Sequence, residues 1–251
     1  MEFEVWQLFL LTAAGTFAGI MNVMAGGGSL LSVPIMLFLG LPGPVANGTN
    51  RISIIAQNAV AIRTFFRRGF ADFRLSLSLS AAAIPGAVLG ALVGVRIEGE
   101  AFDRVLAVIM LGVLILMQFP SKKREGESEP LTRKRLIAGH ILMFGAGCWG
   151  GFIQIGVGFI LMPILHRVMG LDLVRTNMHK VFIALAYNLI AIVIFASAVS
   201  IHWTFGIALA LGNALGGYLG ARFSVAGGEL WIRRAFTLVL IIFIAKLALP
   251  I

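Results

Sequence analysis

Two positively charged side chains lie among apolar stretches of the sequence, each at the end of a short polar run. Arg51 ends the run NGTNR (47–51), and Lys180 ends the run TNMHK (176–180). Guanidinium, ammonium, amide and hydroxyl groups are the donors that bind an oxyanion. A charge within a membrane costs at least about 3 kcal/mol, so such a residue predicts a binding site. The alternative is that both side chains extend to opposite membrane surfaces.

A glycine-rich break and a short apolar segment precede each polar run. The residues of the breaks are Gly26, Gly27, Gly28, Ser29, Gly156 and Gly158. The segments that follow, 29–41 and 157–169, each contain one proline and would be about 20 Å long as helices, against a hydrocarbon core of about 30 Å. They are expected to be short broken helices that either span the membrane or re-enter it. A helix broken inside the membrane exposes N–H groups that bind anions. The alternative role of these glycines is close helix packing.

Further amides occupy matching positions around the breaks. Asn22 and Gln154 come just before them, and the pairs Gln57-Asn58 and Tyr187-Asn188 follow the polar runs. Either these groups bind substrate or they form hydrogen bonds between helices. The predicted substrate-binding residues are Asn22, Gly26, Gly27, Gly28, Ser29, Thr49, Asn50, Arg51, Gln57, Gln154, Gly156, Gly158, Asn177, His179, Lys180 and Tyr187. Asn47 and Asn177 are expected to cap the helices that begin there.

The sequence lacks the residue patterns typical of proton relays, sodium sites, metal sites and ATP-binding sites. Every Asp and Glu falls in a loop or at a segment end, so no carboxylate is expected to relay protons or bind sodium in the membrane. The four histidines are scattered and the single cysteine, Cys148, cannot form an intrachain disulfide, so we expect no metal, no cofactor and no enzyme activity. His179 adjoins Lys180, and its protonation is a candidate for coupling to anion binding. No P-loop is present.

Composition predicts an integral membrane protein. The chain has 251 residues, of which 59% are hydrophobic and only 12% charged, against about 25% charged in soluble domains. The net charge is +9, and the basic residues lie at the ends of apolar runs instead of gathering on one exposed face of a domain. This distribution disfavours nucleic-acid binding. The apolar segments, expected to be membrane helices, are 5–25, 29–41, 47–66, 73–95, 102–119, 135–155, 157–169, 175–199, 203–222 and 230–249.

The two groups of five segments resemble each other at an offset near 130 residues. The matched pairs include Asn47 with Asn177, Asn58 with Asn188, Gly86 with Gly216, and Gly90 with Gly220. Five segments per repeat is an odd number, so the second repeat is expected to be inverted. We therefore predict an all-α fold with a first repeat at 1–120, a cytoplasmic linker at 121–134 and a second repeat at 135–251.

Basic residues predict the orientation. The side opposite the N-terminus receives most of them, including Arg67, Arg68, Arg74, Lys122, Lys123, Arg124, Arg133, Lys134, Arg135, Arg167 and Arg222. By the positive-inside rule this side is cytoplasmic, and both termini are expected outside a bacterial inner membrane.

The sequence resembles the sulfite exporter TauE/SafE family. The resemblance rests on Gly15-x-x-x-Gly19, AGGGSLLSVPIML (25–37) and VANGTN (45–50), and it covers the whole chain. It implies export of sulfite or related organosulfonates in bacteria. It also maps the family's glycine turns to Gly26, Gly27, Gly28, Gly156 and Gly158, and its polar helix starts to Thr49, Asn50, Arg51, Asn177, His179 and Lys180. In the second half, NMHK (177–180) replaces the small residues with Thr and Ser that are common in the family.

The expected function is therefore secondary export of a small sulfur-containing anion by alternating access. An anion channel and a non-transporting membrane subunit of a larger complex are the alternatives. The expected partners are the anion and membrane lipid, and a homodimer is among the assemblies that fit the sequence.

Overall fold

The computed structural model describes residues 4–24, 26–97, 99–118 and 130–226. Within these ranges the chain is helical, and the helices follow the predicted segments closely. They are α1 Val5–Met24, α2 Ser29–Phe38, α3 Gly43–Arg67, α4 Phe73–Gly94, α5 Gly99–Gln118, α6 Arg133–Phe152, α7 Val157–Pro163, the short π-helix η1 Ile164–Val168, α8 Leu173–Ala198 and α9 Trp203–Ala226. The predicted segment 230–249 and most of the linker lie outside the described residues.

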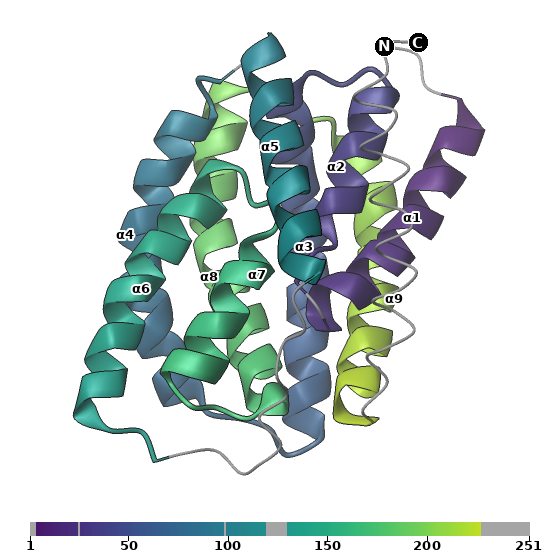
Figure 1. Ribbon diagram of the computed structural model, residues 1–251. Helices are drawn as coiled ribbons and strands as arrows, with labels where there is room; N and C mark the ends of the chain where they lie inside the picture. Colours follow the sequence, from purple (N-terminus) through teal and green to yellow (C-terminus); the bar gives the residue numbers. More distant parts are fainter. Residues whose placement is uncertain (1–3, 25, 98, 119–129, 227–251) are drawn as a thin grey trace.

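The short helices fold back instead of continuing in the direction of the helix before them. In Figure 1, α1 descends from the upper end of the molecule and α2 returns toward that end. Helix α6 rises from the lower end, and α7 with η1 returns downward. We call these pairs the first hairpin (α1–α2) and the second hairpin (α6–α7–η1). They enter the molecule from opposite ends, and the long helices α3 and α8 follow them (Figure 1).

Helix starts depend on residues upstream of the polar runs. Helix α3 begins at Gly43 after Pro42, with Pro44 in its first turn, where a missing N–H costs nothing. Helix α8 begins at Leu173 because the Asp172 side chain accepts from the Arg175 N–H at 2.8 Å. The prediction that Asn47 and Asn177 cap these helices is therefore wrong. Both lie inside their helices, and the polar runs stand deeper in the molecule than a helix start would.

Apolar side chains are distributed as in a membrane protein. Phe9 (73% exposed), Ile141 (68%) and Val193 (66%) point outward, while polar Asn50, Arg51 and Gln57 are 0% exposed. Among the described residues, the helices long and apolar enough to cross a membrane are Val5–Met24, Phe73–Gly94, Leu173–Ala198 and Trp203–Val225. An apolar exterior around a polar interior is the arrangement that a lipid environment favours.

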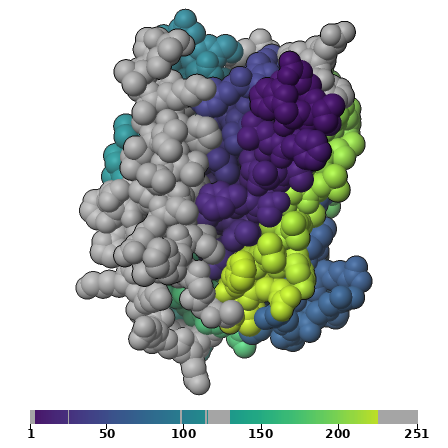
Figure 2. Space-filling view, turned by 90° about the vertical axis from the view of Figure 1, so that its right-hand side faces the viewer, coloured from purple at the N-terminus to yellow at the C-terminus, as the bar shows by residue number. Residues whose placement is uncertain are grey.

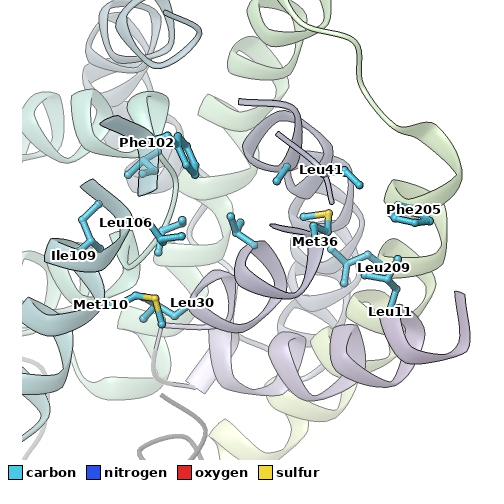
Figure 3. Close-up of a cluster of buried hydrophobic side chains, with 14 of the residues drawn as sticks. Leu11, Leu30, Met36, Leu41, Phe102, Leu106, Ile109, Met110, Phe205 and Leu209 are labelled. Carbon is cyan, nitrogen blue, oxygen red and sulfur yellow. The ribbon is translucent and has the colours of Figure 1, made fainter. Parts of the chain in front are cut away.

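Helix α2 is enclosed by helices on both sides. Its Leu30 lies beside Met110 of α5, and its Met36 lies toward Leu209 of α9 (Figure 3). The same cluster includes Leu11 of α1. This packing holds the first hairpin inside the protein, so its short helix does not have to face lipid.

Glycines bring two helix pairs into close contact. Figure 2 shows α1 and α9 side by side on one face of the molecule. At this contact a Cβ on Gly15 would lie 2.6 Å from the Leu209 carbonyl oxygen. Helices α4 and α6 meet in the same way, because Gly147 of α6 lies against the Ala83 carbonyl of α4. Small residues at such crossings are typical of membrane helices, where close backbone packing drives association.

Gly147→Ala is expected to destabilise the protein, because the added methyl group would overlap the Ala83 carbonyl oxygen. Overpacking of this kind costs about 1–3 kcal/mol. Gly145→Ala is the matched control, since a Cβ at Gly145 meets no atom within 4 Å and alanine favours a helix. Thermal unfolding in detergent should give a lower midpoint for Gly147→Ala and an unchanged or higher one for Gly145→Ala. Equal midpoints would contradict the described α4–α6 contact.

Candidate functional site

The last carbonyl groups of α6 receive their hydrogen bonds from α3. A helix end leaves its final carbonyls without intrahelical partners, and inside a membrane water cannot replace them. The Arg51 guanidinium donates through Nη1 to the Gly150 carbonyl at 3.1 Å and through Nη2 to the Gly151 carbonyl. The Asn47 Nδ2 donates to the Phe152 carbonyl at 3.0 Å. Helix α6 can therefore end inside the protein because α3 supplies the missing donors.

Arg51 is a fully buried cation with dipolar partners. Beyond the carbonyls, its Nη1 donates to Asn188 Oδ1 at 3.0 Å, and its guanidinium carbon lies 4.3 Å from the centre of the Phe195 ring. Its Nε is buried and has no hydrogen-bond partner among the described residues. The side chain is 0% exposed, so it does not extend to a surface. One N–H donor and a positive charge thus remain available inside the protein.

A hydrogen-bond network fixes how Asn188 faces Arg51. Gln154 Oε1 accepts from the Tyr187 hydroxyl at 2.9 Å and from Asn188 Nδ2 at 3.1 Å. Because the Asn188 amide nitrogen is turned toward Gln154, its oxygen points to Arg51. Among the described residues, Gln154 is the one non-glycine residue with a positive φ, at 62°. Such a conformation is uncommon and is often found at functional sites. We call Arg51, Gln154, Tyr187 and Asn188 the arginine cluster.

The end of α1 has a comparable arrangement with a lysine. Lys180 Nζ donates to the Val23 carbonyl at 2.7 Å and to Asn177 Oδ1 at 2.9 Å. Next to Val23, the Asn22 Nδ2 donates to Gln57 Oε1 at 3.1 Å, and Gln57 Nε2 donates to Asn58 Oδ1 at 3.0 Å. These residues form the lysine cluster. In both clusters the cation comes from one half of the chain and the helix end from the other.

The two glycine breaks meet each other. A Cβ built on Gly26 would lie 2.4 Å from the Gly158 Cα, and Gly26 has a φ of 85° that favours glycine. Gly28 lies against the Ala18 carbonyl of α1. At Gly26, Gly28 and Gly158 the absent side chains therefore permit backbone packing, which is the alternative role that the sequence left open.

Comparison with known proteins shows the family of this chain. The family model described as "Sulfite exporter TauE/SafE" matches residues 11–247. The chain belongs to this family. It is 25% identical over 233 residues to a probable membrane transporter protein, ORF9, of Sinorhizobium, covering 92% of this chain and 88% of the relative. No solved structure matches the chain significantly.

Two further relatives are of similar length. A probable membrane transporter protein of Haemophilus influenzae is 25% identical over 247 residues, which cover 98% of this chain and 96% of the relative. The probable membrane transporter protein YfcA of Escherichia coli K12 is 23% identical over 246 residues, covering 96% and 89%. Together with the long apolar helices, these matches identify this TauE/SafE member as a multi-pass membrane protein of a transporter family.

Other predicted site residues of the TauE/SafE protein connect helices outside the two clusters. Asn50 donates to Ser29 Oγ at 3.1 Å and accepts from Ser32 Oγ at 2.7 Å, which joins α3 to α2. Thr49 Oγ1 accepts from the His202 N–H at 3.0 Å at the α8–α9 connection. Gly156, with a φ of 70°, precedes α7 and forms the turn of the second hairpin.

His179 and Asn177 point in different directions although both precede Lys180. The His179 Nδ1 lies 2.8 Å from the Ser76 hydroxyl of α4. The Asn177 amide nitrogen donates to Ser224 of α9 at 2.7 Å. Asn177 and His179 are two positions apart, which is about 200° around an α-helix, so they contact different helices.

The predicted site residues are thus divided between the arginine cluster, the lysine cluster and contacts outside both. Arg51 and Lys180 have different hydrogen-bond partners, and binding of one anion by both stays a prediction. The predicted set left out Asn188 and Asn58, although each is an amide in an apolar run with a match in the other half. It also left out Phe195, and nothing in the sequence distinguishes this phenylalanine from those that face lipid.

Tyr187→Phe is expected to destabilise the protein by about 1 kcal/mol, because it removes the buried hydrogen bond to Gln154 and keeps the ring. Tyr218→Phe is the control, since Tyr218 is 40% exposed and is the one other tyrosine of the chain. Thermal unfolding of both variants in the same detergent measures the difference. A Tyr187→Phe midpoint equal to that of Tyr218→Phe would mean that the network contributes nothing to stability.

Proposed function

We propose that this protein exports a small sulfur-containing anion, sulfite or an organosulfonate, across the bacterial inner membrane. The observation that carries the proposal is the buried charge of Arg51. Its partners are carbonyl groups, an amide and an aromatic ring, and none of the described carboxylates pairs with it. An unneutralised cation in a medium of low dielectric constant attracts an anion strongly. The unpaired Nε–H gives that anion a hydrogen-bond donor.

We infer that transport uses alternating access between two inverted repeats. The contacts of α1 with α9 and of α6 with α4 support this proposal. An offset of 132 relates Gly19 of α1 to Gly151 of α6, and an offset of 130 relates Gly86 of α4 to Gly216 of α9. Each hairpin therefore packs on the fourth helix of the other half, as a two-fold axis in the membrane plane requires. The entry of the two hairpins from opposite ends fits the same symmetry (Figure 1).

The lower end of the molecule in Figure 1 is proposed to face the cytoplasm. Helix α3 ends there with Arg67, and α6 begins there with the basic residues 133–135. This orientation follows the positive-inside rule and puts the start of α1 outside. With a negative cell interior, the membrane potential favours anion exit by about 2.3 kcal/mol per charge per 100 mV. The potential alone can thus drive export.

Proteoliposomes that contain the purified protein test the proposal. With sulfite, a short alkyl sulfonate or sulfate inside, efflux should follow an imposed potential for at least one sulfur anion and should saturate with its concentration. Arg51→Met should lower this flux about 10-fold or more, because the change removes a charge-assisted interaction. Arg63→Met is the matched control on the same helix, since Arg63 is exposed.

Three other outcomes of the proteoliposome experiment would contradict parts of the proposal. No flux of any sulfur anion from folded, reconstituted protein would contradict the proposed function and favour a subunit that needs partners. Flux that does not saturate would favour a channel. Equal flux through Arg51→Met and Arg63→Met would contradict a role of the buried arginine in anion transport.

A further inference from the structure

We propose that Arg51 and Lys180 act as tethered cations that occupy the carbonyl ends of the two broken helices, so that transport requires no sodium ion. The inference deepens the proposed function, on which its transport measurement rests, by stating how transport is coupled. It concerns the C-terminal ends of α1 and α6 and the cations that contact them.

Both helix ends present oxygen atoms of the kind that bind a hard cation. The carbonyls of Gly150 and Gly151, which have no partner within α6, and Asn188 Oδ1 accept hydrogen bonds from the Arg51 guanidinium. The Val23 carbonyl and Asn177 Oδ1 contact the Lys180 ammonium. Carbonyl and amide oxygens are ligands of hard metal ions, and a helix C-terminus carries the negative end of the helix dipole.

In transporters with broken helices, carbonyl groups and helix C-termini of this kind coordinate the coupling sodium ion. Here a side chain of the opposite half supplies the positive charge at each end. Arg51 is 0% exposed and Lys180 is 3% exposed, so a solvent cation would have to displace a buried and hydrogen-bonded group. The cation is therefore a permanent part of the protein and does not move with the substrate.

The arrangement also keeps the positive charge of Arg51 inside the protein with carbonyl groups, an amide and an aromatic ring as its partners among the described residues. A bound sodium ion would leave once per cycle and transfer the energy of its gradient to the substrate. A tethered cation stays, so a sodium gradient does not drive transport.

The stability test compares wild type, Lys180→Ala and the control Arg63→Ala in sodium, methylammonium and choline chloride at equal ionic strength. Wild type and Arg63→Ala should unfold at the same temperature in all three salts. Lys180→Ala should unfold at a lower temperature in choline, and methylammonium or sodium should raise its midpoint by about 2–4 °C by binding at the vacated oxygens. Choline is the control cation, because its quaternary ammonium group is larger than methylammonium and has no N–H donor.

Two results would overturn the inference. One is a wild-type midpoint that rises in sodium relative to choline, which would reveal an open cation site. The other is a Lys180→Ala midpoint that is the same in all three salts. If Lys180→Ala yields no folded protein, the wild-type comparison still decides.

The transport test measures wild-type anion efflux with sodium or choline on both sides of the membrane. Equal rates are expected, and flux that needs sodium would overturn the inference. Absence of flux in both salts would contradict the proposed function, and the stability test would then decide the inference alone.

Discussion

The carbonyl groups at the inner end of α6 are the constraint on which the rest of this structure depends. A helix that stops inside an apolar protein leaves its last carbonyls without partners, and each unsatisfied group costs several kcal/mol in a membrane. Arg51 and Asn47 of α3 supply the donors. The break in one half is thus stable only while a helix of the other half lies beside it. Lys180 and the end of α1 repeat this dependence in the opposite direction.

The use of charged side chains as donors to the helix-end carbonyls has an electrostatic consequence. Neutral donors would have satisfied the carbonyls, but an arginine and a lysine also bring positive charge into the interior. Carbonyl and amide dipoles stabilise the charge of Arg51, and none of the described carboxylates pairs with it, which supports the proposal of an anion substrate. The proposed oxyanion would bring several acceptor oxygens to the unpaired Arg51 Nε–H.

Much of the fold could be predicted from the sequence, because apolar runs and glycine breaks determine where membrane helices lie. The positions of the short helices and the interior location of Arg51 and Lys180 were accessible in this way. Their hydrogen-bond partners were not, because Gly150, Gly151 and Val23 contribute backbone carbonyls that every residue has. The helix starts were mispredicted at the polar runs because Pro42 and Asp172, further upstream, begin the helices earlier.

The most direct measurement is an experimental structure of the protein with a bound sulfur oxyanion, determined at a resolution that separates the guanidinium nitrogens. We expect anion density within hydrogen-bond distance of Arg51 Nε, while Nη1 and Nη2 stay on the carbonyls of α6. An anion bound away from both cations would contradict it. So would an Arg51 side chain that leaves the end of α6 for a carboxylate.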